Sequence, residues 1–289
     1  MNKILVQLDT DHHPAVFDRV VAVDSDVEQL FSYGSVTCEN VTGLVHGTMF
    51  TRGPADLKNT AIFVGGSQVA DAERLMKKVQ SIFFGPMRVS VMMDSNGCNT
   101  TAAAAIASAK KHIPLADASA VVLGATGPVG LRVAELLAME KAHVTIVSRT
   151  MDRAQAACNA ILQRLPNARL TPAVAVSHDE FEQVSQNKNL LVAAGAAGTC
   201  FLPEGALQRL SVLQVAIDLN AVPPVGIADV GVTDKATDHS GVICYGALGV
   251  GGLKMKVHKR AVRQLFESND QVLDTYSIYT LALQVAGLT

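Results

Sequence analysis

The stretch Val121–Gly130, which reads VVLGATGPVG, decides the fold of this chain. It opens with a β-branched apolar run typical of a buried strand, and its proline suits the first turn of a helix. Gly124, Gly127 and Gly130 occupy every third position from the end of this apolar run into the predicted helix. Such glycines permit a tight turn and let backbone N–H groups approach a pyrophosphate, which then faces the positive end of the helix dipole. The stretch predicts a dinucleotide site, to which we assign Gly124, Thr126, Gly127, Pro128, Val129 and Gly130.

The end of the next predicted strand, His143–Val147, distinguishes the two nicotinamide cofactors. NAD sites usually place Asp or Glu there, whereas this chain has Ser148, Arg149 and Thr150, with Arg153 soon after. Cations and hydroxyls suit a 2′-phosphate that a carboxylate would repel. The sequence therefore favours NADP, with NAD as an alternative cofactor; the competing interpretation is that both arginines are solvated surface residues. We expect the nicotinamide ribose near three residues that end later strands: Ala194, Gly195 and Asn220.

Apolar runs alternate with helical patterns along all 289 residues, a length typical of about two domains. This alternation predicts parallel strands with crossover helices. We expect an α/β fold, with a Rossmann-like NADP domain at 113–266 and a second α/β domain at 1–112 that is joined by helices in 267–289. The predicted strands are Ile4–Leu8, Ala61–Val64, Arg88–Met93, Ala120–Leu123, His143–Val147, Asn189–Ala194, Val212–Leu219 and Val242–Tyr245. The predicted helices are Pro14–Val21, Ser67–Ser81, Asn99–His112, Pro128–Met139, Met151–Leu165, Val250–Phe266 and Tyr276–Val285.

Composition excludes several classes of protein. Hydrophobic residues make up 49% of the chain, charged residues 17%, and the net charge is −2. A chain without excess positive charge is a poor partner for nucleic acid. The longest apolar stretches, such as Leu190–Leu202, fall well short of the ~20 residues of a membrane span. Five widely spaced cysteines predict reduced thiols and no metal site. We expect a cytoplasmic protein whose first segment is a strand and not a signal peptide.

Polar residues also follow the strands of the first domain. Asp9 and Asp11, with two histidines after them, end the first strand. A polar loop explains them better than a metal site, and both carboxylates are candidates to line a cleft. Asp94, Asn96 and Asn99 gather at a helix start, where capping accounts for most of them.

Residues 246–256 read GALGVGGLKMK and lead into a helix. Close approach of the backbone to a ligand, a hinge, or tight strand–helix packing would each explain the glycines. His258 follows Lys254 by four residues, and we expect both on a solvent-facing side of this helix.

Taken together, these motifs resemble the NADP-dependent methylene-tetrahydromethanopterin dehydrogenases of methylotrophic and related bacteria. The resemblance covers nearly the whole chain and is most specific at 94–104 and 246–254. The matching stretches are residues 9–11, 16–18, 33–34, 51–53, 60–66, 83–86, 94–104, 126–130, 220–224 and 246–254.

The resemblance implies a pterin domain and an NADP domain with a cleft between them. It implies oxidation of the one-carbon unit that bridges N5 and N10 of the pterin to a methenyl cation, in formaldehyde oxidation, by a homo-oligomer (a trimer or hexamer). On this basis we expect Lys256 and Asp94 to be catalytic. The residues expected to bind the pterin are Asp9, Asp11, Phe17, Asn96, Asn99 and Lys254.

Three alternatives stay open. The carrier could be tetrahydrofolate, which the sequence does not exclude. The chain could bind NADP without catalysis, although a first domain with so many polar strand ends argues against a simple sensor. A shikimate-type dehydrogenase would need a Lys/Asp proton-transfer pair in the first domain, and the sequence offers no convincing one.

Overall fold

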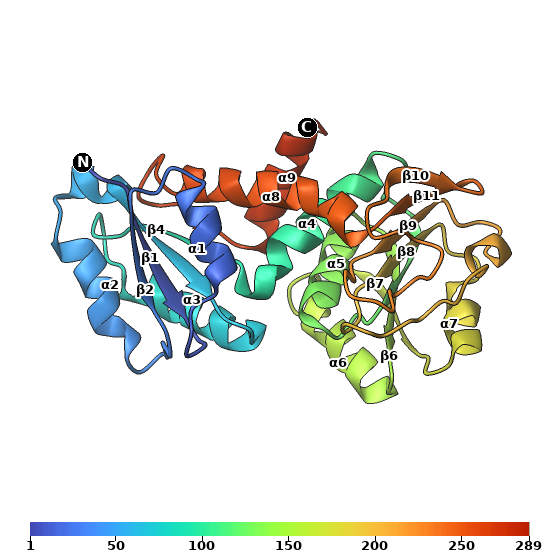
Figure 1. Ribbon diagram of the computed structural model, residues 1–289. Coiled ribbons are helices and arrows are strands. Elements are labelled where there is room, and N and C mark those ends of the chain that lie inside the picture. The colour runs from blue at the N-terminus through green and yellow to red at the C-terminus, as the bar shows by residue number, and fades with distance from the viewer. Residues whose placement is uncertain (289) are drawn as a thin grey trace. The chain divides into compact units, whose positions relative to one another are not determined.

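The computed structural model describes residues 1–288, and their contacts divide the chain into two compact units (Figure 1). The first unit comprises residues 1–100 and 255–281, and the second comprises residues 101–254 and the chain from Ala282 on. Both divisions fall earlier in the chain than the domain boundaries expected at residues 112 and 266. They lie inside helices α4 (Cys98–Lys110) and α8 (Ala247–Gln264). Asp94, after β4, accepts N–H groups at the start of α4, and His258 of α8 stacks on Phe63 of β3, so these parts of the two helices belong to the first unit.

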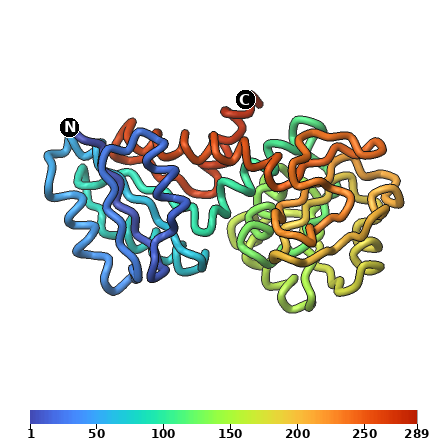
Figure 2. Tube along the Cα trace, viewed as in Figure 1, coloured from blue at the N-terminus to red at the C-terminus, as the bar shows by residue number. Residues whose placement is uncertain are grey.

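The first unit is built on a parallel sheet with strand order β12-β4-β3-β1-β2. This order reverses direction between β1 and β3, so the unit has a switch point where loops leave opposite faces of the sheet. Strand β12, from the red C-terminal part of the chain in Figure 2, pairs with β4 at the edge of this sheet. The elements are β1 (Ile4–Asp9), α1 (Val16–Val23), β2 (Gln29–Tyr33), α2 (Val41–Phe50), β3 (Thr60–Gly65), α3 (Val69–Ile82), β4 (Ser90–Met93) and β12 (Val272–Leu273), with 3-10 turns at Pro54–Asn59 and Ser95–Gly97.

Helix α3 illustrates how the sequence pattern builds this unit. The helix expected at Ser67–Ser81 is present, and its apolar residues Ala72, Leu75, Met76 and Val79 are all buried against the sheet. The helix begins later than expected, at Val69, and its N-cap Gln68 makes no side-chain hydrogen bond. Ser67 instead donates its backbone N–H and its hydroxyl to Asp11.

The second unit contains a sheet of order β10-β11-β9-β8-β5-β6-β7, in which only β10 runs antiparallel to its neighbour. From β7 to β11 this is the doubly wound order of dinucleotide-binding domains, with its switch point between β5 and β8. The expected fold class is confirmed. The elements are β5 (Ser119–Leu123), α5 (Pro128–Met139), β6 (His143–Ser148), α6 (Met151–Leu162), β7 (Arg169–Val174), α7 (His178–Ser185), β8 (Leu190–Ala193), a 3-10 turn (Leu207–Arg209), β9 (Val215–Asp218), β10 (Lys235–His239) and β11 (Val242–Tyr245), and α9 (Thr275–Ala286) ends the described chain.

The strands and helices that the sequence failed to predict carry weak sequence signals. Strands β2, β7 and β10 are sheet edges with few buried side chains, so they lack the apolar run of a central strand. Helix α2 contains Gly43 and Gly47, which lower helix propensity. Helix α7 is short and largely polar, and its capping box at Ser177 and Glu180 is the one sequence signal for it.

Candidate active site

The glycine turn after β5 is possible only because two of its positions, Gly124 and Gly130, lack side chains. Gly124 has a φ of +74°, and a Cβ there would lie 2.8 Å from the Cα of Gly195. A Cβ on Gly130 would lie 2.5 Å from the carbonyl oxygen of Gly124. The turn, the loop after β8 and the first turn of α5 therefore pack backbone against backbone. This is the close approach that a pyrophosphate cradle requires.

Helix α5 starts in the way that the sequence predicts for an anion site. Gly127 is its N-cap in extended conformation and provides no side-chain cap, and Pro128 occupies the first helical position. A helix start without a capping side chain leaves donors and the positive dipole end for a bound anion. The residues present thus fit the phosphates of a dinucleotide.

A pocket of about 260 Å³ lies at the carboxyl ends of β5, β6 and β8. This is the switch point of the second sheet, where ligands of doubly wound folds bind. None of the described lining residues carries a carboxylate, which fits a phosphorylated ribose better than an unmodified one. The sequence-predicted residues that line it are Gly124, Thr126, Gly127, Ser148, Arg149, Arg153, Ala194 and Gly195.

The cationic side of this pocket comes from β6 and α6. Ser148 ends β6 and is buried, whereas Arg149 and Arg153 are exposed. Thr150 is the N-cap of α6 and lies outside the pocket lining. Two exposed guanidinium groups beside a buried hydroxyl can bind a phosphate by charge-assisted hydrogen bonds.

An aromatic wall of the pocket escaped the sequence analysis. A Cβ on Gly195 would lie 2.3 Å from Cζ of Phe201, so this glycine makes room for the ring. Phe201 in turn packs edge-on against Phe181 of α7, with 4.9 Å between ring centroids. Both rings line the pocket. They come from segments without a ligand motif, and no sequence signal identified them.

Asn220 lies apart from the residues that line the pocket, at the end of β9. Its amide donates to the carbonyl oxygen of Pro224 and its side-chain oxygen accepts the N–H of Val222. The preceding Asp218 is buried and accepts the N–H groups of Asn220 and Ile227. Burial raises the pKa of Asp218. In this structure Asn220 therefore shapes its own loop.

The carboxyl edge of the first sheet is held together by its own acidic side chains. Asp9 is fully buried and accepts the N–H groups of Asp11 and Ala15. Burial raises the pKa of Asp9, against the lowering effect of these two amides. Asp11 bridges to Ser67, so the loops after β1 and β3 are joined at the switch point. Within residues 1–288, no group of three or more His, Cys, Asp or Glu side chains could hold a metal ion.

Asp94 and Asn99 anchor the start of α4 and have no exposed surface. Asp94 accepts the N–H groups of Asn99 and Thr100 through Oδ1, and the hydroxyl of Thr100 through Oδ2 at 2.6 Å. Asn99 donates to the carbonyl of Met93 and accepts the hydroxyl of Thr275. Asn96, in contrast, is exposed, with a φ of +51°. Of these three candidate residues, only Asn96 presents its side chain to solvent.

Helix α8 differs from the expectation of a solvent-facing side. Lys256 is exposed, but Lys254 is buried and the side chain of His258 has no exposed surface. The imidazole of His258 stacks on Phe63 of β3, with 5.8 Å between ring centroids and 14° between planes. Its other aromatic neighbour is Phe17 of α1, which is 51% exposed. The structure thus brings Phe17, His258 and Asp94 together in the first unit, whereas Lys254 belongs to the second.

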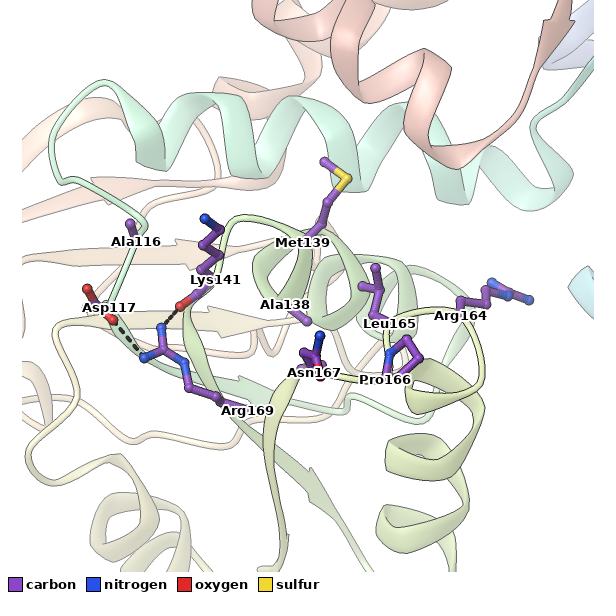
Figure 3. A pocket seen from close by; sticks show the side chains of 11 residues that line it. Ala116, Asp117, Ala138, Met139, Lys141, Arg164, Leu165, Pro166, Asn167 and Arg169 are labelled. Atoms are coloured by element: carbon purple, nitrogen blue, oxygen red, sulfur yellow. Dashed lines mark hydrogen bonds and ion pairs between the residues drawn. The ribbon is translucent and has the colours of Figure 1, made fainter.

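A larger pocket of about 440 Å³ lies near the amino ends of β5 and β7, away from the glycine turn (Figure 3). Its cations do not converge on a ligand position. Arg169 donates to Asp117 and to the carbonyl oxygen of Lys141, and Arg164 pairs with Glu135. Both arginines of this cavity are paired within the protein, so we do not assign it a ligand.

Known proteins resemble this chain both at the level of family and at the level of fold. A family described as methylene-tetrahydromethanopterin dehydrogenase, N-terminal, matches residues 16–96. Quinate dehydrogenase from Corynebacterium glutamicum in complex with NAD is 12% identical over 98% of this chain and 99% of its own, with a TM-score of 0.53. That likeness concerns the fold alone.

Two relatives from Methylorubrum extorquens AM1 cover the chain almost completely. The Bifunctional protein MdtA is 43% identical over 98% of this chain and 99% of its own length. An NAD(P)-dependent methylenetetrahydromethanopterin dehydrogenase is 30% identical over the same shares of the two chains. No helix within residues 1–288 has the length and apolar character of a membrane span. With the glycine turn, the cationic pocket and these relatives in agreement, the chain belongs to the methylene-tetrahydromethanopterin dehydrogenase family.

Proposed function

We propose that this protein is an NADP-dependent dehydrogenase that oxidises 5,10-methylene-tetrahydromethanopterin to the 5,10-methenyl cation, with NAD as a weaker acceptor. The observation that carries the proposal is the pocket at the glycine turn, which joins a phosphate cradle to Arg149 and Arg153 without a carboxylate. Its place in a chain 43% and 30% identical to family members supports the pterin as substrate.

In the second unit, the backbone of 124–130 binds the pyrophosphate, and Pro128, Val129 and Gly130 present the first turn of α5 to it. Ser148, Arg149 and Arg153 hold the 2′-phosphate, and Thr150 starts the helix that carries Arg153. Ala194 and Gly195 face the nicotinamide ribose, beside the wall formed by Phe201. Asn220 supports this region by fixing the loop after β9.

In the first unit, the carboxyl edge of the sheet binds the pterin. We assign Phe17, Asn96 and Lys256 to direct contact, because all three are exposed. Asp9 and Asp11 hold the loops that shape this edge and place negative charge near the cationic product. Asp94 and Asn99 position the start of α4 beneath it. Lys254, also expected to bind the pterin, is buried, so we assign it no direct contact with the substrate.

This division of labour suits a reaction that needs positioning more than acid–base chemistry. The nitrogen lone pairs of the substrate expel hydride from the bridging carbon, so no proton has to move in that step. NADP, when bound, supplies the nicotinamide carbon that accepts the hydride. The chain contributes by orienting both molecules and excluding water, and such positioning is worth ~7–11 kcal/mol of barrier lowering.

The test is absorbance at 340 nm after the protein is mixed with NADP and methylene-tetrahydromethanopterin, repeated with NAD and with methylene-tetrahydrofolate. We expect a rise that is fastest with NADP and the methanopterin carrier. A faster rise with the folate carrier would assign the enzyme to folate chemistry. Binding of NADPH without any absorbance change would make the chain a nucleotide-binding module.

We also propose that the protein works in the cytoplasm as a homo-oligomer. The odd number and wide spacing of its cysteines suit a reducing compartment. Val16, Val20 and Val23 of α1 are each more than half exposed, and Phe31 and Tyr33 are exposed on the edge strand β2 beside it. Clustered apolar surface of this kind marks an interface. Sedimentation velocity should show an oligomer for the wild type and a smaller species for Val20→Glu.

A further inference from the structure

His258 has no part in the function described so far, yet it lies at the carboxyl edge of the first sheet. Its side chain has no exposed surface, while Lys256, two residues earlier on α8, is exposed. Burial of a polar imidazole costs free energy unless specific contacts compensate for it. A phenylalanine or leucine would fill the same volume without that cost, so the ring nitrogens call for an explanation.

The aromatic contacts of His258 lead from the rigid sheet toward the surface. The imidazole stacks on Phe63, which is buried in the central strand β3. Its second ring contact is Phe17 of α1, at 6.2 Å between centroids and 35° between planes. Phe17 is half-exposed and is assigned above to direct contact with the pterin, on which its ring can stack. The imidazole therefore connects a fixed strand to a substrate-facing ring.

The polar contact of His258 leads to the start of α4. Its Nδ1 lies 3.7 Å from Oδ2 of Asp94, the oxygen that also accepts the hydroxyl of Thr100. The other oxygen of Asp94 accepts two backbone N–H groups of α4. A carboxylate held by three donors cannot move without breaking them, so it provides a fixed reference for the ring. Stacking and the carboxylate together define both the place and the rotation of the imidazole.

We propose that His258 is a positioning residue for hydride transfer, which sets the orientation of the Phe17 ring and fixes α8 so that Lys256 reaches the pterin. This inference rests on the proposed function. A positioning role differs from a space-filling role in two ways. The imidazole must act through Phe17, and substitution of His258 must change pterin kinetics without changing nucleotide binding.

A double-mutant cycle tests this coupling. The variants are Phe17→Leu, His258→Phe and the combination of both, with His178→Phe on the exposed start of α7 as a matched control. A displaced stacking ring should raise KM for the pterin and lower kcat, each by about tenfold, and leave KM for NADP within about twofold. The double variant should be no worse than the poorer single variant, because both changes remove the same interaction. The control should match the wild type.

Two results would overturn the inference. Effects that multiply in the double variant would show that His258 does not act through Phe17. A lower melting temperature with unchanged kcat and pterin KM would show that the histidine only stabilises the fold. If the wild type itself fails to reduce NADP with the pterin, the proposed function has failed, which differs from an active wild type whose His258 variants behave normally.

A second measurement covers the case in which His258→Phe does not fold. His258→Gln keeps a polar group at the position. The fluorescence of bound NADPH measures the fraction of protein molecules that are folded. In the wild type, ¹⁵N-labelled imidazole resonances of His258 should shift when the reduced pterin is added without NADP. Resonances that stay in place at saturating pterin would contradict the positioning role.

Discussion

The carboxyl edges of the sheets in the two units are built in opposite ways. Each is a doubly wound, mostly parallel sheet with a switch point at its carboxyl edge. In the second unit that edge is kept open by glycines, and exposed arginines surround a pocket. In the first unit the same edge is closed by Asp9, Asp11 and Asp94, which bind backbone N–H groups of its own loops. One edge offers its backbone to a ligand, whereas the other uses its side chains to build a rigid surface.

The largest effect should come from Asp94→Ala. The substitution leaves two amides and one hydroxyl of α4 without their acceptor. Each unsatisfied buried donor costs ~1–3 kcal/mol, so we expect a loss of ~3–5 kcal/mol in the free energy of unfolding. Urea denaturation measures it. A loss below ~1 kcal/mol would mean that Asp94 is not structural in the way described, and would favour a direct catalytic role.

The next effect belongs to the open edge. Arg149→Ala should weaken NADP binding by about 10- to 100-fold, because a charge-assisted contact is worth ~1.5–3 kcal/mol. NAD, which lacks the phosphate, should lose less than about twofold. The matched control is Arg209→Ala, an exposed arginine paired with Glu182 and absent from the pocket lining. Equal losses for NADP and NAD would contradict a phosphate contact.

This contrast also explains how far the sequence could be understood without a structure. The glycine turn was predictable because its function depends on backbone conformation, and only glycine fits where a Cβ would meet Gly195 or Gly124. Asp94 and Asn99 were predicted as site residues through the family resemblance, although capping of a helix start also explained them. Sequence does not reveal whether a carboxylate faces solvent or caps a helix, and here both side chains face inward.

Other misses have the same origin in tertiary packing. His258 was expected in solvent because it follows Lys254 by four residues on one side of the helix, but the structure places its ring against Phe63. Phe201 gave no signal, since its place depends on a glycine six residues earlier. Edge strands such as β10 lack the apolar runs by which central strands are identified.

A smaller and pH-dependent effect should distinguish the two edges through their buried aspartates. Burial raises the pKa of both Asp9 and Asp218. The folded state therefore holds the proton more strongly, and stability falls as pH rises from the ordinary aspartate pKa to the raised one. As the pH rises from acidic to neutral, Asp9→Asn and Asp218→Asn should each lose less unfolding free energy than the wild type, because neither variant has a buried carboxyl group to ionise.

Kinetics then separate these two variants. Asp9→Asn should also raise KM for the pterin, whereas Asp218→Asn should not, because Asp218 organises the loop of the second unit. Chemical denaturation across pH and steady-state assays give both quantities. An Asp9 variant with unchanged pterin KM would remove this edge from the substrate site.

The smallest effect is expected for Asn220→Ala. The side chain makes two hydrogen bonds within its own loop, so the unfolding free energy should fall by about 1 kcal/mol. NADP affinity should change by less than about twofold. A tenfold loss of NADP affinity with unchanged stability would instead place Asn220 in contact with the nucleotide.

The most direct test of the account is a crystal structure with NADP and methylene-tetrahydromethanopterin bound. We predict the pyrophosphate on the backbone of 124–130, the 2′-phosphate beside Arg149, and the pterin against Phe17 at the carboxyl edge of the first sheet. A glycine turn filled only by water, with the nucleotide bound elsewhere, would contradict the central claim.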